Sequence, residues 1–101
     1  MTKVIYKIQY NDFRDGDEPV AFFPEEPGNQ SPYTCMCYQH LGQHSAACVQ
    51  YAAGLRPATP EQYQRLHWEL TKIVGYTDLK VVKRFTQKSQ EIRKQKLEQW
   101  K

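Results

Sequence analysis

The chain has 101 residues, of which 40% are hydrophobic and 13% aromatic, a composition that suits one domain around a single core. No apolar run is long enough to cross a bilayer, which excludes a membrane-spanning helix and predicts no membrane partner. Residues 1–10 alternate polar and apolar side chains, a pattern that differs from a signal peptide. The three cysteines are therefore expected to be reduced thiols in the cytoplasm.

The net charge of +3 is unevenly distributed along the chain. Residues 1–79 carry six Lys and Arg against nine Asp and Glu, a net charge of −3. Residues 80–101 carry eight against two, a net charge of +6. An acidic body with a cationic C-terminal segment could bind a phosphate-bearing molecule, an acidic protein or no partner at all.

The N-terminal third predicts a β-hairpin. Apolar side chains from Val4 to Tyr10 recur at every second position, as in a strand. Turn-forming residues that include Asp15-Gly16 follow, and then comes a second apolar run at 20–23. Pro24 is expected to end this second strand, because proline lacks the N–H that a ladder needs.

The middle of the chain predicts a loop over 24–32, a third strand over 33–38 and a short helix over 45–53. Ser45 would cap this helix and Gly54 would end it, although its Cys, Val and Tyr residues also suit a strand.

The clearest helix signal begins at Thr59-Pro60, where a capping hydroxyl precedes a proline at the first helical position. Apolar residues then recur at intervals of three and four up to Val74, and Gly75 ends the pattern. A final strand is expected over 79–85.

These elements predict an α+β fold with a three- to four-stranded, mostly antiparallel sheet and one main helix packed on one face. Residues 1–85 would form the domain, and residues 86–101 a basic tail that is helical or disordered.

Five thiol and imidazole side chains lie within fourteen residues, and thiolates with imidazoles are ligands that zinc prefers. The candidate metal ligands are Cys35, Cys37, His40, His44 and Cys48. Paired C-x2-C motifs are missing, so no cofactor is expected and zinc remains the alternative. The default interpretation is small buried cysteines beside loop histidines, with Cys35 and Cys37 facing the same way on a strand.

A thiolate nucleophile with a histidine base is the enzymatic alternative. The candidate functional loop consists of Cys37, His40, Gly42, Gln43 and His44.

The default interpretation of the basic tail is a charged, solvated helix. The alternative is that its cations neutralise phosphates and bind nucleic acid. Its candidate contacts are Lys83, Arg84, Lys88, Arg93, Lys94 and Lys96. Trp68 and Trp100 could instead anchor a homo-oligomer.

The hairpin with the following segment Phe23-Pro24-Glu25-Glu26-Pro27-Gly28 resembles the N-terminal module of HicB-type antitoxins. This resemblance implies a degenerate RNase H-like α+β fold without catalysis. It also implies binding to a small protein, with nucleic acid reached through a C-terminal element. The pattern Cys37-Tyr38, His40, Gly42-Gln43-His44 is similar to that of small uncharacterised bacterial proteins and implies no activity.

The function predicted from these observations is that of a non-catalytic binding or regulatory module. Its partner would be a protein, or nucleic acid bound through the tail. The alternative is a metal-binding protein or a Cys/His-dependent enzyme that uses residues 35–48.

Overall fold

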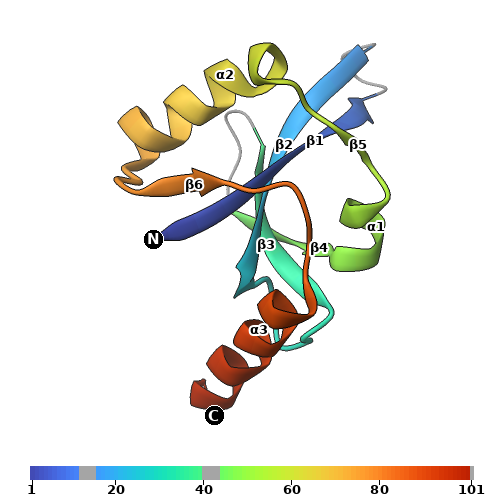
Figure 1. The fold of residues 1–101 in the computed structure, drawn as a ribbon, viewed down its shortest axis with the longest axis vertical. Helices are drawn as coiled ribbons and strands as arrows, with labels where there is room; N and C mark the ends of the chain where they lie inside the picture. The colour runs from blue at the N-terminus through green and yellow to red at the C-terminus, as the bar shows by residue number, and fades with distance from the viewer. Residues whose placement is uncertain (12–15, 40–43, 101) are drawn as a thin grey trace.

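A computed structural model describes residues 1–11, 16–39 and 44–100 (Figure 1). The elements in chain order are β1 (Thr2–Asn11), β2 (Gly16–Pro27), β3 (Thr34–Gln39), β4 (Ser45–Cys48), α1 (Val49–Ala53), β5 (Arg56–Pro57), α2 (Pro60–Glu69), the π-helical turn η2 (Leu70–Val74), β6 (Leu79–Val81) and α3 (Gln87–Gln99).

The strands form one sheet in the order β4-β3-β2-β1-β5, and β6 also pairs with β1. Every pairing is antiparallel except that of β1 with β6. The α+β class and the mostly antiparallel sheet are therefore confirmed, but six strands form where three or four were expected. The additional strands are the short segments β4 and β5.

β1 is a central strand whose second edge is shared by two partners. β2 pairs with it along one edge, from Ile5 opposite Phe22 to Asn11 opposite Gly16. On the other edge, β6 pairs with residues 2–4 and β5 pairs with residues 7–8. The hairpin prediction is thus confirmed, whereas Asp15 of its turn lies outside the described residues. On this edge, the middle of β1 therefore lies at a gap between β6 and β5.

Alternation along the strands divides the core into two clusters, one on each face of the sheet. One face is covered by α2, and its buried residues are Val4, Tyr6, Ala21, Phe23, Tyr38, Leu66 and Leu70. The buried residues of the other face are Ile5, Val20, Phe22, Cys35, Cys37 and Ala52. Leu66 and Leu70 belong to the apolar stripe expected from the sequence, so the prediction that this helix packs on one face is confirmed.

The boundaries of α2 follow from its sequence. The hydroxyl of Thr59 accepts a hydrogen bond from the Gln62 amide at 3.3 Å, and the Gln62 side chain accepts one from the Thr59 amide at 2.9 Å. This reciprocal capping box sets the start. Gly75 has a φ of 105°, a left-handed conformation that glycine adopts without strain, and it ends the helical segment.

Three boundary predictions are wrong. β2 continues through Pro24 to Pro27, because an irregularity between Phe23 and Pro27 lets the strand re-pair with Cys35. Residues 45–48 form strand β4, so the helix expected from Ser45 begins only at Val49. The last strand ends at Val81 instead of residue 85.

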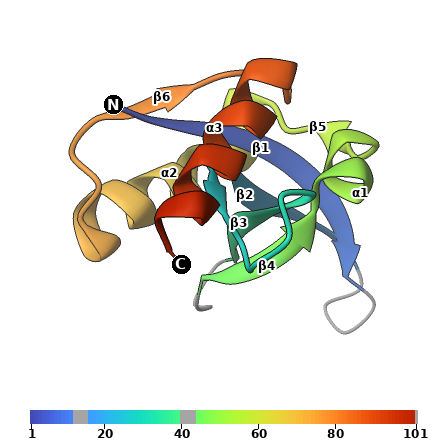
Figure 2. The same cartoon turned by 90° about the horizontal axis from the view of Figure 1, so that it is seen from below.

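The basic C-terminal segment forms α3, which begins with a second capping box at Thr86. α3 lies beside the end of β2, as Figure 2 also shows. Its Arg93 is buried and donates hydrogen bonds to the carbonyl oxygens of Pro24 and Pro32. A domain boundary at residue 85 stays a prediction. In the described ranges, no helix combines the length and apolarity needed to span a membrane.

Candidate functional site

The Cys/His group expected from the sequence is divided by the sheet. Cys35 and Cys37 are buried together in the cluster opposite α2. His44 lies against the other cluster, with its ring centroid 5.1 Å from that of Tyr38 and 5.9 Å from that of Phe23. His40, Gly42 and Gln43 lie outside the described residues. The two thiols and the described histidine therefore face opposite sides of the sheet.

The environments of the three cysteines also differ. Cys35 is fully buried, and burial raises the pKa of its thiol to about 12, so it is protonated at neutral pH. Cys37 is hydrogen-bonded through Sγ to Oγ of Ser45 at 3.1 Å, and Cys48 is exposed opposite Thr34. Among residues 1–11, 16–39 and 44–100, no three His, Cys, Asp or Glu side chains are grouped so that they could hold a metal ion.

A polar pair beneath α2 was not anticipated from the sequence. The hydroxyl of Tyr38 donates a hydrogen bond of 2.6 Å to Oε2 of the buried Glu69. This bond, together with burial, raises the pKa of Tyr38 to about 12. Nearby, Nε2 of His44 is hydrogen-bonded to the Tyr76 hydroxyl at 3.0 Å. The His44 ring also lies against the rings of Tyr38 and Tyr76. Mutual hydrogen bonds and ring packing indicate a mainly structural role for these side chains.

The candidate nucleic-acid contacts fall into three groups. Lys83, Arg84, Lys88 and Lys94 are exposed. Lys96 forms an ion pair with Glu26 at 2.6 Å that is about one third exposed on both sides. The prediction that Arg93 contacts phosphate is wrong in this structure of α3. The Arg93 side chain is only 2% exposed, and its guanidinium donates to two backbone carbonyls.

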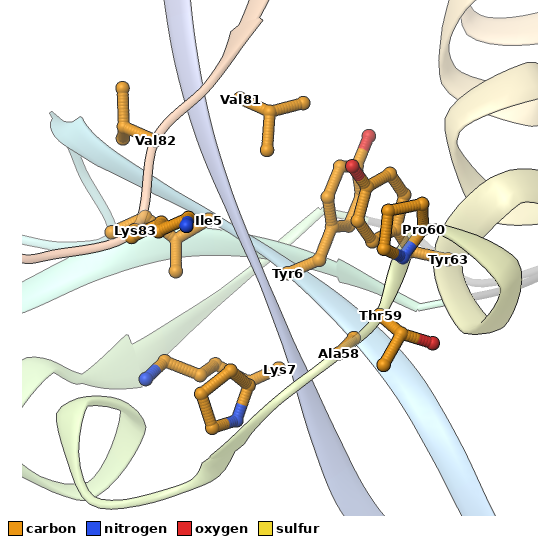
Figure 3. A pocket seen from close by; sticks show the side chains of 11 residues that line it. Ile5, Tyr6, Lys7, Ala58, Thr59, Pro60, Tyr63, Val81, Val82 and Lys83 are labelled. Atoms are coloured by element: carbon orange, nitrogen blue, oxygen red, sulfur yellow. The ribbon is translucent and has the colours of Figure 1, made fainter.

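A pocket of about 430 Å³ lies at the edge of β1 between β5 and β6 (Figure 3). It exists because β5 and β6 pair with separate stretches of β1 and leave a gap between them. The Val82 amide donates to the Val4 carbonyl at 2.9 Å on one side, and the Ala58 amide donates to the Tyr6 carbonyl at 3.1 Å on the other. Because the pocket lies at a strand edge, side chains from both faces of β1 reach it. Its lining residues are Ile5, Tyr6, Lys7, Pro57, Ala58, Thr59, Pro60, Tyr63, Val81, Val82 and Lys83.

One wall of the pocket is aromatic. The rings of Tyr6 and Tyr63 are stacked with centroids 4.2 Å apart. The Tyr6 hydroxyl is hydrogen-bonded to Nδ1 of His67 at 2.8 Å, which fixes the ring. Burial, and to a lesser extent the neighbouring Tyr63, raises the pKa of Tyr6 above its ordinary value. This wall is therefore neutral and rigid.

The charge in the pocket is positive. Lys7 is only 7% exposed and donates to the Leu55 carbonyl at 3.2 Å, whereas Lys83 is exposed at the rim. No Asp or Glu of the described chain lines the pocket. Apolar walls with two cations suit an organic anion. Sequence reasoning missed this site, since Lys7 had only the signal of a polar position in an alternating strand.

Comparisons with models of known families, with curated proteins and with solved structures found no match to this chain. The resemblance to HicB-type antitoxins accordingly stays a prediction.

Proposed function

We propose that this protein is a non-catalytic module that binds single-stranded nucleic acid at the β1 edge pocket. The observation that carries the proposal is that residues 80–88 both line an apolar and aromatic pocket and carry exposed cations. Lys83 lines the pocket, and Lys80, Arg84 and Lys88 are exposed on either side of it in sequence.

The two parts of this site match the two parts of a nucleotide. A base presents flat apolar faces that pack on aromatic and aliphatic side chains, and the phosphates bind Lys and Arg. A single strand fits better than a duplex, because only unpaired bases are free to enter a pocket. Residues 80–101 carry the net charge of +6 that would attract such a strand.

We propose a non-catalytic role because the described Cys and His side chains do not combine into a nucleophile with a base beside it. A thiolate mechanism needs a base within hydrogen-bond distance of the nucleophile. Cys35 and Cys37 lie on the face opposite His44, and Cys35 is held protonated by burial.

The experiment is a salt titration of binding to a fluorescein-labelled oligo(U) strand, measured by fluorescence anisotropy. The double variant Lys83→Gln/Arg84→Gln should reduce the magnitude of the negative slope of log K against log salt by about 1.4, since each single-strand phosphate contact contributes about 0.7. Lys72→Gln, an exposed lysine of η2 that does not line the pocket, is the matched control and should keep the wild-type slope. The proposal fails if the strand is not bound at low salt, or if the double variant and the control behave alike.

A protein partner is the second candidate, favoured by exposed apolar side chains on α2 and η2. Trp68 is 54% exposed and Ile73 is 65% exposed. Large exposed aromatic residues are common at the centres of protein interfaces. A Trp68→Ala variant separates the two candidates, because it removes this surface and leaves the β1 edge pocket intact.

A further inference from the structure

The side chain of Lys7 has an unusual position for an ammonium group. It is more than nine-tenths buried, and it lines the pocket. Its Nζ donates to one neutral acceptor, the Leu55 carbonyl, at 3.2 Å. None of the ion pairs found among the described residues involves it. An ammonium has three N–H donors, and a buried charge is unfavourable without an opposite charge nearby. An anion that enters the pocket would supply an opposite charge to this ammonium group.

The second lysine of the pocket belongs to the same side of β1. Figure 3 shows Ile5, Lys7 and Lys83 on one side of β1, whereas Tyr6 and Tyr63 lie on the other side. Odd-numbered residues of β1 share this face, as the membership of Ile5 in the second cluster also indicates. A compact, highly charged group bound on this side of β1 would share that side with both lysines.

The size of the pocket limits what else can enter with that group. At about 430 Å³ it lies towards the lower end of the range for ligand pockets, roughly 300–1,000 Å³. This is room for one nucleotide and not for a stretch of strand. An internal nucleotide carries one negative charge on its diester, whereas a phosphate monoester carries about −1.5 to −2 at neutral pH. Two lysines in a pocket whose lining contains no described Asp or Glu match the monoester better.

We propose that the pocket receives the terminal nucleotide of a strand that ends in a phosphate monoester, with Lys7 and Lys83 binding the phosphate. This inference rests on the proposed function and specifies which part of the nucleic acid occupies the site. The base packs between Val81 and Val82 on the β6 side of the pocket and Pro57 on the β5 side. The rest of the strand leaves past Arg84 and Lys88. In this assignment Lys7 and Lys83 select for the free end, and the exposed Arg84 and Lys88 add affinity without selection.

The test compares three labelled oligo(U) strands of equal length: one with hydroxyl groups at both ends, one with a 5′-phosphate and one with a 3′-phosphate. Wild-type protein should bind one of the two phosphorylated strands about tenfold or more tightly than the hydroxyl strand, as expected for hydrogen bonds between charged groups in a partly buried site. The strand that gains affinity identifies which end enters. The gain should grow between about pH 5 and pH 7, because the second proton of a phosphate monoester dissociates near pH 6.

Lys7→Gln is the decisive variant, because glutamine can still donate to the Leu55 carbonyl but carries no charge. It should abolish the gain from the terminal phosphate, so that the three strands bind the variant with nearly equal affinity. Lys72→Gln should retain the gain. If Lys7→Gln does not fold, as judged by thermal denaturation, Lys83→Gln replaces it, since Lys83 is exposed and its loss should reduce the gain without affecting the fold.

The outcomes separate this inference from the proposed function. Salt-dependent binding of all three strands with equal affinity would overturn the terminal-phosphate assignment and leave nucleic-acid binding standing. The same assignment is overturned if Lys7→Gln keeps the full gain. Failure to bind any of the strands at low salt would remove both.

Discussion

Arg93 is the residue that we expect to fix α3 to the rest of the protein. It is 2% exposed, and its Nη1 and Nε atoms donate to the carbonyl oxygens of Pro24 at 2.5 Å and Pro32 at 3.1 Å. Burial lowers the pKa of Arg93 from its ordinary value, but that value is so high that the guanidinium remains charged at neutral pH. Substitution by methionine preserves much of the apolar volume and removes both donors.

The size of the effect can be worked out from these contacts. Hydrogen bonds from a charged group contribute about 1.5–3 kcal/mol each. Part of this is offset, because methionine does not have to be desolvated as a guanidinium does. Arg93→Met should therefore lower the free energy of unfolding by about 2–4 kcal/mol, which corresponds to a fall in Tm of roughly 8–30 °C for a domain of this size.

Lys96 provides the matched control on the same helix. Its ion pair with Glu26 is about one third exposed on both sides, and such pairs contribute about 0.2–1 kcal/mol. Lys96→Met should therefore lower Tm by only a few degrees. Urea and thermal denaturation followed by circular dichroism measure both variants. Equal losses in the two variants would refute the reasoning, because water would then be satisfying the two carbonyls and α3 would be held by its apolar contacts alone.

Two further substitutions test the packing of β3. Gly28→Ala places a Cβ atom 2.5 Å from a backbone oxygen of β3 and 2.7 Å from the Cβ of Ala46, so it should destabilise the protein by several kcal/mol. Gly54→Ala is the control, because its Cβ atom meets nothing closer than 3.6 Å and should be tolerated. Urea denaturation measures both variants. Equal stability of the two variants would contradict the close approach. Because the pKa of Tyr38 is raised from 10 to about 12 in the folded state, its contribution to stability is complete below pH 10 and is lost between pH 10 and 12. Tyr38→Phe should be less stable at pH 7 and should lose less stability than wild type over that interval in denaturation at stepped pH; parallel curves would contradict this.

The parts of the fold that were predictable carry a local signal. The segment from Thr59 to Gly75 contains its own start, its apolar stripe and its stop, so each feature is read from neighbouring residues. The hairpin is similar, since alternation and a turn lie within a single stretch. The common orientation of Cys35 and Cys37 also follows from local alternation and is confirmed by their shared cluster.

The features that escaped prediction depend on distant partners. β5 has two residues, Arg56–Pro57, too few for any periodicity, and it is a strand only because the edge of β1 is available. Arg93 lies in a polar segment that looks solvated throughout, yet its acceptors are 61 and 69 residues away in sequence. The position of His44 relative to the thiols depended on a chain reversal that residue types do not specify.

The anchor of α3 and the β1 edge pocket are separable, although one segment of chain connects them. Lys83 follows Val82, whose amide is bonded to the Val4 carbonyl, and precedes Phe85, whose ring lies edge-on to Phe22 with centroids 6.3 Å apart. Both attachments are made to the sheet and neither involves α3. Lys83 is thus held in place even where the contacts of Arg93 are lost. The less stable Arg93→Met protein should accordingly bind oligo(U) as wild type does at temperatures where both are folded; a loss of binding there would mean that α3, and not the sheet, positions the cations of the pocket.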